Sequence, residues 1–168
     1  VIDPLVAIAG PTITGSGVAD RALFGTAVAV SDDGQYLAVG SPQDVTGTDV
    51  TGSARVFQRA AGAWTEEAII RPPAGAARVG DLVALDGSGA LMAVGAWSAG
   101  LTTVSGIYAR STTGWTLEGT LDRPSVFFLT ALALNHDGTR ALSNDSDGRG
   151  WIYRRDGGLW ATEAVLPP

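Results

Sequence analysis

A hairpin pattern that recurs three times constrains the fold of this chain more than any other feature. The first copy, residues 24–42, reads FGTAVAVSDDGQYLAVGSP, and its two short apolar runs flank an Asp-Asp-Gly turn. Glycine adopts a positive φ at no steric cost and Asp hydrogen-bonds to its own backbone, so this pattern favours a β-hairpin. Residues 79–95 align with the first copy without a gap, and residues 131–142 align with its hairpin.

Two further strands are predicted after each hairpin, and a tryptophan marks the start of the last one. In the second copy this outermost strand alternates, with Trp115 and Leu117 on one face and Thr116 and Glu118 on the other. Such a strand has one solvent-exposed face, whereas the hairpin strands are apolar on both faces and should be buried between sheets. The recurring tryptophans are Trp64, Trp115 and Trp160.

This change from buried to amphipathic strands, with a repeat of about 45–55 residues, is typical of a β-propeller blade. We predict an all-β chain of three four-stranded antiparallel blades at residues 24–77, 78–127 and 128–168. The hairpin turns should centre on Gly34, Gly89 and Gly138.

The same pattern predicts which side chains lie between the blades. Inner-strand residues such as Leu37, Met92 and Leu132 should be fully buried. The glutamates of the outermost strands should be exposed, namely Glu66, Glu118 and Glu163.

Residues 1–23 are expected to hold an extra N-terminal strand and a connection from a preceding blade. The apolar run at residues 5–9 resembles residues 68–73 and 164–168, which end the first and third repeats. Closed propellers have about four to eight blades, so three blades leave two apolar faces open. We therefore expect a processed chain or a fragment that is part of a larger assembly. It would be a segment of a longer polypeptide, or a protomer that completes a ring or filament with copies of itself or with other chains.

The composition excludes several classes of function. The 168 residues carry a formal net charge of −6, whereas proteins that bind nucleic acid need basic patches. The chain has no cysteine, which excludes disulfides and thiolate metal sites. No apolar run reaches the roughly 18 residues that a membrane-spanning helix needs.

Several of these motifs together resemble the FG-GAP repeat, in its bacterial and protist variant. They are Phe24-Gly25, the Asp-Gly turn, the LAVGSP run, GSARVFQR at residues 52–59 and GAWT at residues 62–65. The resemblance covers residues 24–168 and is weakest in the third repeat, where Asn144-Asp145 replaces the GAP element. FG-GAP repeats build β-propellers such as the integrin α-subunit head and some lectins, so the resemblance implies a propeller with a part in cell adhesion, structure or glycan binding.

The best candidate metal site is a calcium loop formed by Asn144, Asp145 and Asp147. Calcium takes six to eight oxygen ligands, and alternating polar residues in a Gly-containing loop supply several. The loop lacks the distal glutamate of typical calcium loops, so a plain turn is the alternative. Asn144 also begins an Asn-Asp-Ser sequon, which makes it a glycosylation candidate.

Other candidate residues are few. Trp97 and Trp151 fall outside the recurring tryptophan position, so an exposed indole there would be a contact for a sugar or a partner. His136 is the only histidine and is expected in a hairpin turn. No cluster of acid, base and nucleophile is apparent, so the sequence predicts that the chain is not an enzyme.

These observations lead to one expected function and one alternative. We expect a non-enzymatic structural or interaction module of an extracellular or surface-exposed assembly, such as a virion, appendage or filament. It would need no cofactor apart from calcium at the candidate loop, and its partners would be other protein chains or copies of itself. The alternative is a lectin-like, carbohydrate-binding propeller with glycans as partners.

Overall fold

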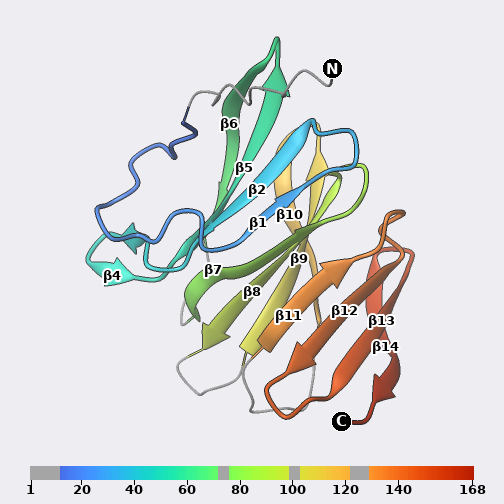
Figure 1. Cartoon of the computed structure of the whole chain (residues 1–168). Helices are drawn as coiled ribbons and strands as arrows, with labels where there is room; N and C mark the ends of the chain where they lie inside the picture. The colour runs from blue at the N-terminus through green and yellow to red at the C-terminus, as the bar shows by residue number, and fades with distance from the viewer. Residues whose placement is uncertain (1–11, 72–75, 99–102, 122–128) are drawn as a thin grey trace, which may run out of the picture.

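The computed structural model describes residues 12–71, 76–98, 103–121 and 129–168. Within these ranges the chain consists of strands, turns and loops, with no helix, and three four-stranded antiparallel sheets follow one another along the sequence (Figure 1). These sheets are three blades of a β-propeller, as the sequence predicts. No helix in the described ranges is long and apolar enough to cross a membrane.

Each blade is a meander whose strands pair in chain order. Blade 1 contains β1 (Val28–Val30), β2 (Tyr36–Ser41), β5 (Ser53–Ala60) and β6 (Ala63–Ile70). A two-stranded hairpin of β3 (Val45–Thr46) and β4 (Asp49–Val50) projects from the connection between β2 and β5. Blade 2 contains β7 (Ala76–Leu85), β8 (Leu91–Ser98), β9 (Thr103–Ser111) and β10 (Gly114–Leu121). Blade 3 contains β11 (Leu129–Leu134), β12 (Arg140–Asp145), β13 (Gly150–Asp156) and β14 (Leu159–Leu166).

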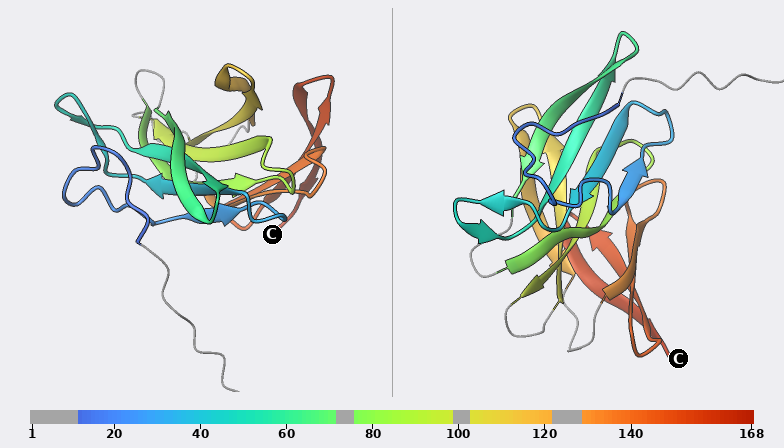
Figure 2. Two further views of the ribbon diagram at one scale, coloured as in Figure 1. Left: turned by 90° about the horizontal axis from the view of Figure 1, so that it is seen from above. Right: turned by 60° about the vertical axis from the view of Figure 1, so that its left-hand side comes forward.

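The three inner hairpins turn at equivalent glycines. Gly34, Gly89 and Gly138 have φ values of 66°, 67° and 66°, in the left-handed region that favours glycine. The predicted turn positions are therefore confirmed. The sheets lie side by side, and the first strand of blade 2, β7, contacts both β1 and β11 (Figure 2).

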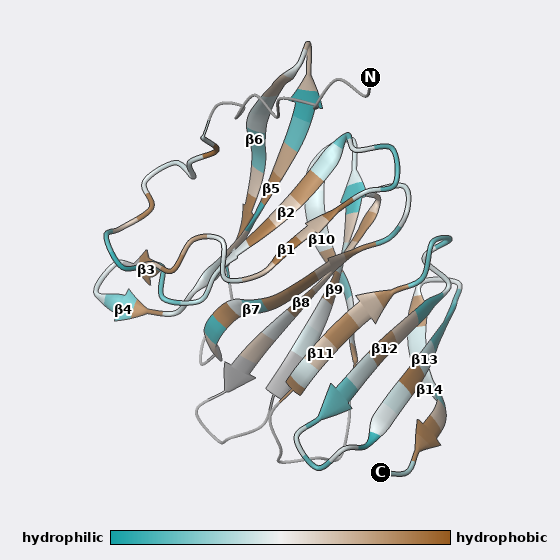
Figure 3. Cartoon of the chain, viewed as in Figure 1, coloured by the Kyte–Doolittle hydropathy of each residue, from teal (hydrophilic) through white to brown (hydrophobic). Residues whose placement is uncertain are grey.

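Two apolar cores lie between neighbouring blades. We call the face of a blade that points toward the next blade its forward face, and the opposite face its backward face. The middle strand β8 serves both cores, because Met92 and Val94 pack against blade 1 while Leu91 and Ala93 pack against blade 3. Apolar residues follow the inner strands β1, β2 and β7 in Figure 3. This arrangement is why an inner strand is apolar on both faces.

Glycine allows blades 1 and 2 to approach backbone to backbone. A Cβ built on Gly40 would lie 1.9 Å from the carbonyl oxygen of Gly80, so neither position has room for a side chain. Gly80 has a φ of 91°, and its equivalent in blade 1, Gly25, has a φ of 92°. The repeated glycine of the FG pair therefore holds the same backbone conformation in both blades.

The end blades depart from the predicted burial. Leu37 in blade 1 and Leu132 in blade 3 are half-buried rather than fully buried, whereas Met92 in the middle blade is fully buried. Among the outer-strand glutamates, Glu66 and Glu118 are half-buried rather than exposed, because arginine side chains pair with both. The predicted extra strand at residues 5–9 lies outside the described residues.

Met92→Ala should lower the free energy of unfolding by about 2–5 kcal/mol, because the truncation leaves a cavity at a fully buried position between two blades. Urea denaturation followed by tryptophan fluorescence measures the change. The control is Leu159→Ala, whose side chain is 77% exposed and whose loss should change stability by less than about 0.5 kcal/mol. Similar losses in the two variants would contradict the position of β8 between two cores.

Candidate functional site

The inner hairpin turns of the three blades are joined in series by backbone hydrogen bonds. The N–H of Asp32 in blade 1 donates to the carbonyl of Gly87 in blade 2, at 2.9 Å. The N–H of Gly87 donates in turn to the carbonyl of His136 in blade 3, also at 2.9 Å. Because the three residues hold the same position in the repeat, the turns form a regular line across the blades.

Two side chains from this line meet over the middle turn. Nδ1 of His136 contacts Oδ2 of Asp32, although the residues are 104 positions apart in the chain. A Cβ on Gly87 would lie 2.3 Å from that Nδ1 atom and 2.8 Å from that Oδ2 atom, so the absence of a side chain at Gly87 lets the pair form. Both side chains are exposed to solvent.

This carboxylate–imidazole pair is the arrangement most suited to chemistry in the described part of the chain. An imidazole held by a carboxylate can accept a proton from a molecule bound beside it, or donate one to it. Sequence reasoning placed His136 in a turn, which is confirmed, but missed Asp32 as its partner. The available signal was the shared repeat position of Asp32, Gly87 and His136.

The structure does not bring the predicted calcium ligands together. Asn144 and Asp145 are neighbours on β12 and therefore point to opposite faces of the sheet. Asn144 Oδ1 accepts a hydrogen bond from the Thr130 hydroxyl at 2.9 Å, and Asp145 Oδ1 accepts from the backbone N–H groups of Asp147 and Arg149 at 3.1 Å each. These bonds shape a turn, and no group of three or more potential metal ligands occurs among the described residues.

The two candidate contact tryptophans have different outcomes. Trp151 lies in β13 and is 8% exposed, packed in the core between blades 2 and 3, so its indole presents no contact surface. Burial follows from its place on the backward face of blade 3. Trp97 belongs to β8 by its backbone, and its side chain lies outside what the structure describes. Glycosylation of Asn144, which is half-buried, remains a prediction.

A buried ion-pair network on blade 1 was not foreseen from the sequence. The Arg55 guanidinium is fully buried and donates to Asp44 Oδ2 at 2.8 Å and to Glu66 Oε2 at 3.1 Å. It also donates to the carbonyl of Ser16 at 2.8 Å, and the Ser53 hydroxyl donates to Asp44 at 2.7 Å. The network ties the N-terminal segment and the projecting β3–β4 hairpin to the blade.

The network also sets the protonation of Asp44. Burial would raise the pKa of this carboxyl, but hydrogen bonds from Ser53, Arg55 and the backbone of Val45, with the positive charge of Arg55, hold the pKa below its ordinary value. Asp44 is therefore charged at neutral pH and compensates the buried arginine.

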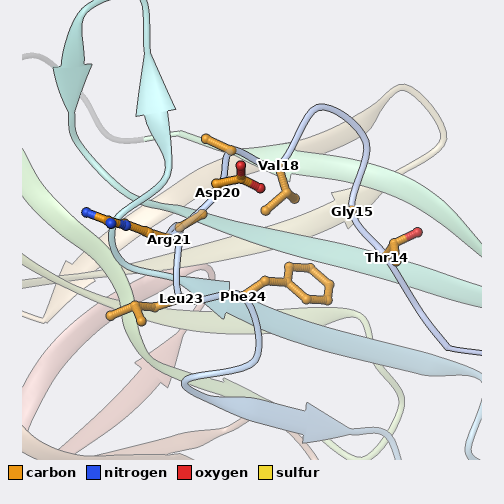
Figure 4. Close-up of a pocket in the computed structure, with 9 residues that line it drawn as sticks. Thr14, Gly15, Val18, Asp20, Arg21, Leu23 and Phe24 are labelled. Carbon is orange, nitrogen blue, oxygen red and sulfur yellow. The ribbon is translucent and has the colours of Figure 1, made fainter.

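The N-terminal segment, residues 12–24, covers the outer half of the backward face of blade 1. The Phe24 ring meets the Phe57 ring edge-on, with centroids 6.2 Å apart. The segment curves around a hollow of about 380 Å³ (Figure 4), whose lining residues include Thr14, Val18, Asp20, Arg21 and Phe24. The hollow is lined by one continuous stretch of the chain, and its charged side chains are Asp20 and Arg21.

A second hollow lies on the forward face of blade 3. It has a volume of about 300 Å³ and is lined chiefly by Ala133, Leu142 and Ile152, with Arg140 at its side. These residues come from β11, β12 and β13, so the hollow spans the open face of the sheet.

No protein-family model matches this sequence, and no curated protein matches it. Solved structures do resemble the fold. A protein assigned as a 6-phosphogluconolactonase from Bacteroides uniformis is similar with a TM-score of 0.60 and 14% identity, over 86% of this chain and 43% of that one. A second protein of this assignment, from Bacteroides fragilis, is similar with a TM-score of 0.59 and 18% identity, over 83% and 38%.

Saccharomyces cerevisiae Sqt1 is also similar, with a TM-score of 0.58 and 9% identity, over 85% of this chain and 35% of Sqt1. The chain thus spans about two fifths of the length of these proteins. At such low identities the likeness shows the fold alone.

The comparisons correct one expectation. The sequence predicted that the chain is not an enzyme, because no catalytic cluster is apparent in it. This prediction is wrong: two of the similar structures are assigned to an enzyme class, 6-phosphogluconolactonase, so blades of this kind are not restricted to proteins without catalysis. The absence of a catalytic motif in sequence is weak evidence here, since the Asp32–His136 pair forms only in three dimensions.

Asp44→Asn should destabilise the chain at neutral pH by about 3–5 kcal/mol, because it leaves the buried Arg55 charge without its closest partner. Because the folded-state pKa of Asp44 is lowered, its stabilisation is present above the unfolded pKa near 3.9 and is lost as the pH falls through the folded value. The deficit of the variant should therefore shrink toward low pH.

Urea denaturation from neutral pH down to about pH 3 measures this dependence. Asp49→Asn, in the exposed strand β4, is the control and should have little effect. A pH-independent deficit in Asp44→Asn would show that the loss does not come from the charge of Asp44.

Proposed function

We propose that this chain is a propeller segment that binds other protein through its two open blade faces, as a structural or interaction module of an extracellular or surface-exposed assembly. The observation that carries the proposal is the exposure of apolar side chains at positions that are buried elsewhere in the repeat. Val28 and Val30 on the backward face of blade 1 are 63% and 58% exposed. Their equivalents in blade 2, Val83 and Leu85, are each 9% exposed.

The forward face of blade 3 shows the same contrast. Leu142 is 38% exposed, whereas Ala38 and Ala93 at its repeat position are fully buried. Contiguous exposed apolar surface of this kind marks interaction sites on folded proteins. Both ends of the row of blades therefore support binding of a further blade-like surface.

The FG-GAP resemblance supports a repeat class that works in adhesion and assembly, and it is part of this proposal. The lectin-like alternative has less support, because Trp151 is buried and offers no stacking surface for a sugar. The exposed apolar faces favour protein over glycan as the partner.

A second candidate function is catalytic, and the Asp32–His136 pair is the observation that favours it. The pair is open to solvent and can transfer a proton. The two similar proteins assigned as 6-phosphogluconolactonases suggest 6-phosphogluconolactone as the first substrate to test. Hydrolysis by this chain that is lost in His136→Asn and kept in Asp137→Asn would support it.

Removing apolar side chains from both open faces should reduce binding of the dye ANS, a probe of exposed hydrophobic surface. The folded chain, diluted until it is monomeric, should bind ANS, and the double variant Val30→Ser/Leu142→Ser should bind markedly less. Leu159→Ser is the control, since its exposed side chain lies near a hairpin tip. Absence of dye binding by the folded wild-type monomer would contradict the proposal.

A further inference from the structure

The two interfaces within the chain share a charged contact at the outer strands. In the interface between blades 2 and 3, Arg155 Nε donates to Glu118 Oε1 at 2.7 Å, and its second nitrogen donates to the other carboxylate oxygen. In the interface between blades 1 and 2, Arg110 lies 4.0 Å from Glu67. In each case a glutamate on the forward face of one blade meets an arginine on the backward face of the next.

The glutamates occupy one defined position, a β-bulge in the outermost strand. The register shifts around Glu67 in β6, around Glu118 in β10 and around Glu163 in β14. A bulge adds an unpaired residue and re-aims its side chain. The repeated bulge therefore directs one carboxylate per blade toward the following blade.

The arginines occupy an equally regular position. Arg110 pairs with Trp115 across the sheet and Arg155 with Trp160, and Arg59 pairs with Trp64 in the same way. Among the described residues, blade 1 carries the arginine of the contact without a glutamate from a preceding blade, and blade 3 carries the glutamate without an arginine from a following blade.

The two end residues differ from their partnered equivalents. In the described part of the chain the Arg59 side chain is exposed and makes no hydrogen bond or ion pair. Glu163 turns back to Arg140 of its own blade, at 2.8 Å. Blade 1 and blade 3 therefore each present one half of the contact that joins neighbouring blades.

The line of hairpin turns is incomplete at both ends as well. Gly87 uses both its N–H and its carbonyl in bonds to neighbouring blades. Among the described residues, the carbonyl of Asp32 and the N–H of His136 at the same positions have no such bond. One end thus offers an acceptor and the other end a donor.

The residues at the positions of Gly40 and Gly80 also suit a contact between blade 3 and blade 1. At this position of the repeat each internal interface has glycine on at least one side: Gly40 meets Gly80, and Gly95 meets the Leu129 side chain. At the ends, Asn144 has the position of Gly40, and Gly25 has the position of Gly80. A Cβ built on Gly25 has no atom within 4 Å, so it leaves space for a side chain such as Asn144.

We infer that blade 3 of one copy packs against blade 1 of a second copy, with Glu163 beside Arg59 and the His136 N–H beside the Asp32 carbonyl. This inference rests on the proposed function and names its partner as a second copy of this chain. Leu142 and Ile152 would cover Val28 and Val30. Two copies make a ring of six blades, within the usual range of about four to eight, whereas three copies make nine.

The N-terminal segment covers part of the backward face of blade 1, since residues 12–14 share a hollow with Phe57, Ala63 and Trp64, and it leaves β1 and the Arg59 side chain exposed. It packs on Phe57 and bonds to Glu66 through Ser16, over the outer part of the backward face of blade 1. The inner strand β1 remains exposed, and Arg59 lies beyond Phe57 toward the hairpin tip of β5, where it is exposed. The docking surface therefore combines β1 with this tip.

Sedimentation velocity over a range of concentrations tests the inference. The wild-type chain should form a species of twice its 17.1 kDa mass. Arg59→Glu and Glu163→Arg should each weaken self-association at least about tenfold, because each places like charges together in both interfaces of the ring. Circular dichroism and thermal melts confirm that each variant is folded.

An equimolar mixture of the two variants gives the sharpest result. In a mixed pair, Glu163 of the Arg59→Glu chain faces native Arg59, and the new arginine of the other chain faces the new glutamate. The mixture should therefore recover the double-mass species that neither variant forms alone. Asp49→Arg, in the hairpin that projects from blade 1, is the charge-reversal control and should associate as the wild type does.

Two results would overturn the inference without contradicting the proposed function, and a third would overturn both. A wild-type chain that stays monomeric but binds ANS has open faces whose partner is not a second copy. A double-mass species that is unaffected by Arg59→Glu uses another surface. A monomer that binds no ANS would overturn both this inference and the proposed function.

Discussion

Each blade of this chain has apolar side chains on both faces of its inner strands, so each blade needs a neighbour on both sides. In the described part of the chain only the middle blade has two, and there Met92 and Ala93 are completely buried on opposite faces of one strand. The burial of these inner strands is the interaction on which the rest depends, because it fixes the turns, the close glycine approaches and the outer ion pairs in register. Val28 and Leu142 belong to the same kind of inner strand, and they are exposed because no blade covers their face among the described residues.

The sequence predicts the features that depend on local chemistry. Gly34, Gly89 and Gly138 could be placed because a tight turn between two apolar runs needs a positive φ, and periodicity alone located the strands. The partial exposure of Leu37 and Leu132 was not predicted, because periodicity shows that a strand has an apolar face and not whether another blade covers it. Contacts between blades depend on which repeat positions face each other, and a linear pattern does not display that.

The site features show the same division. The Asp32–His136 pair joins residues 104 positions apart over Gly87, and the Arg55 network joins three separate segments. Neither has a local motif, so reading His136 and Asp44 one at a time treats them as turn and loop residues. The candidate calcium loop shows the converse: its spacing is suggestive, but alternation along β12 sends Asn144 and Asp145 to opposite faces.

The chemistry of the two ends also limits how such a chain can associate. An interface with a two-fold axis through it would pair the face that carries Arg59 with itself, or the face that carries Glu163 with itself, and neither pairing would join Arg59 to Glu163. The internal interfaces are instead head-to-tail, with glutamate against arginine and a hairpin carbonyl against a hairpin N–H. A head-to-tail contact either closes into a ring or continues as a filament, depending on the rotation between copies. The rotation between successive blades accumulates in one sense in a propeller, and continued addition of blades by this rule therefore favours closure into a ring.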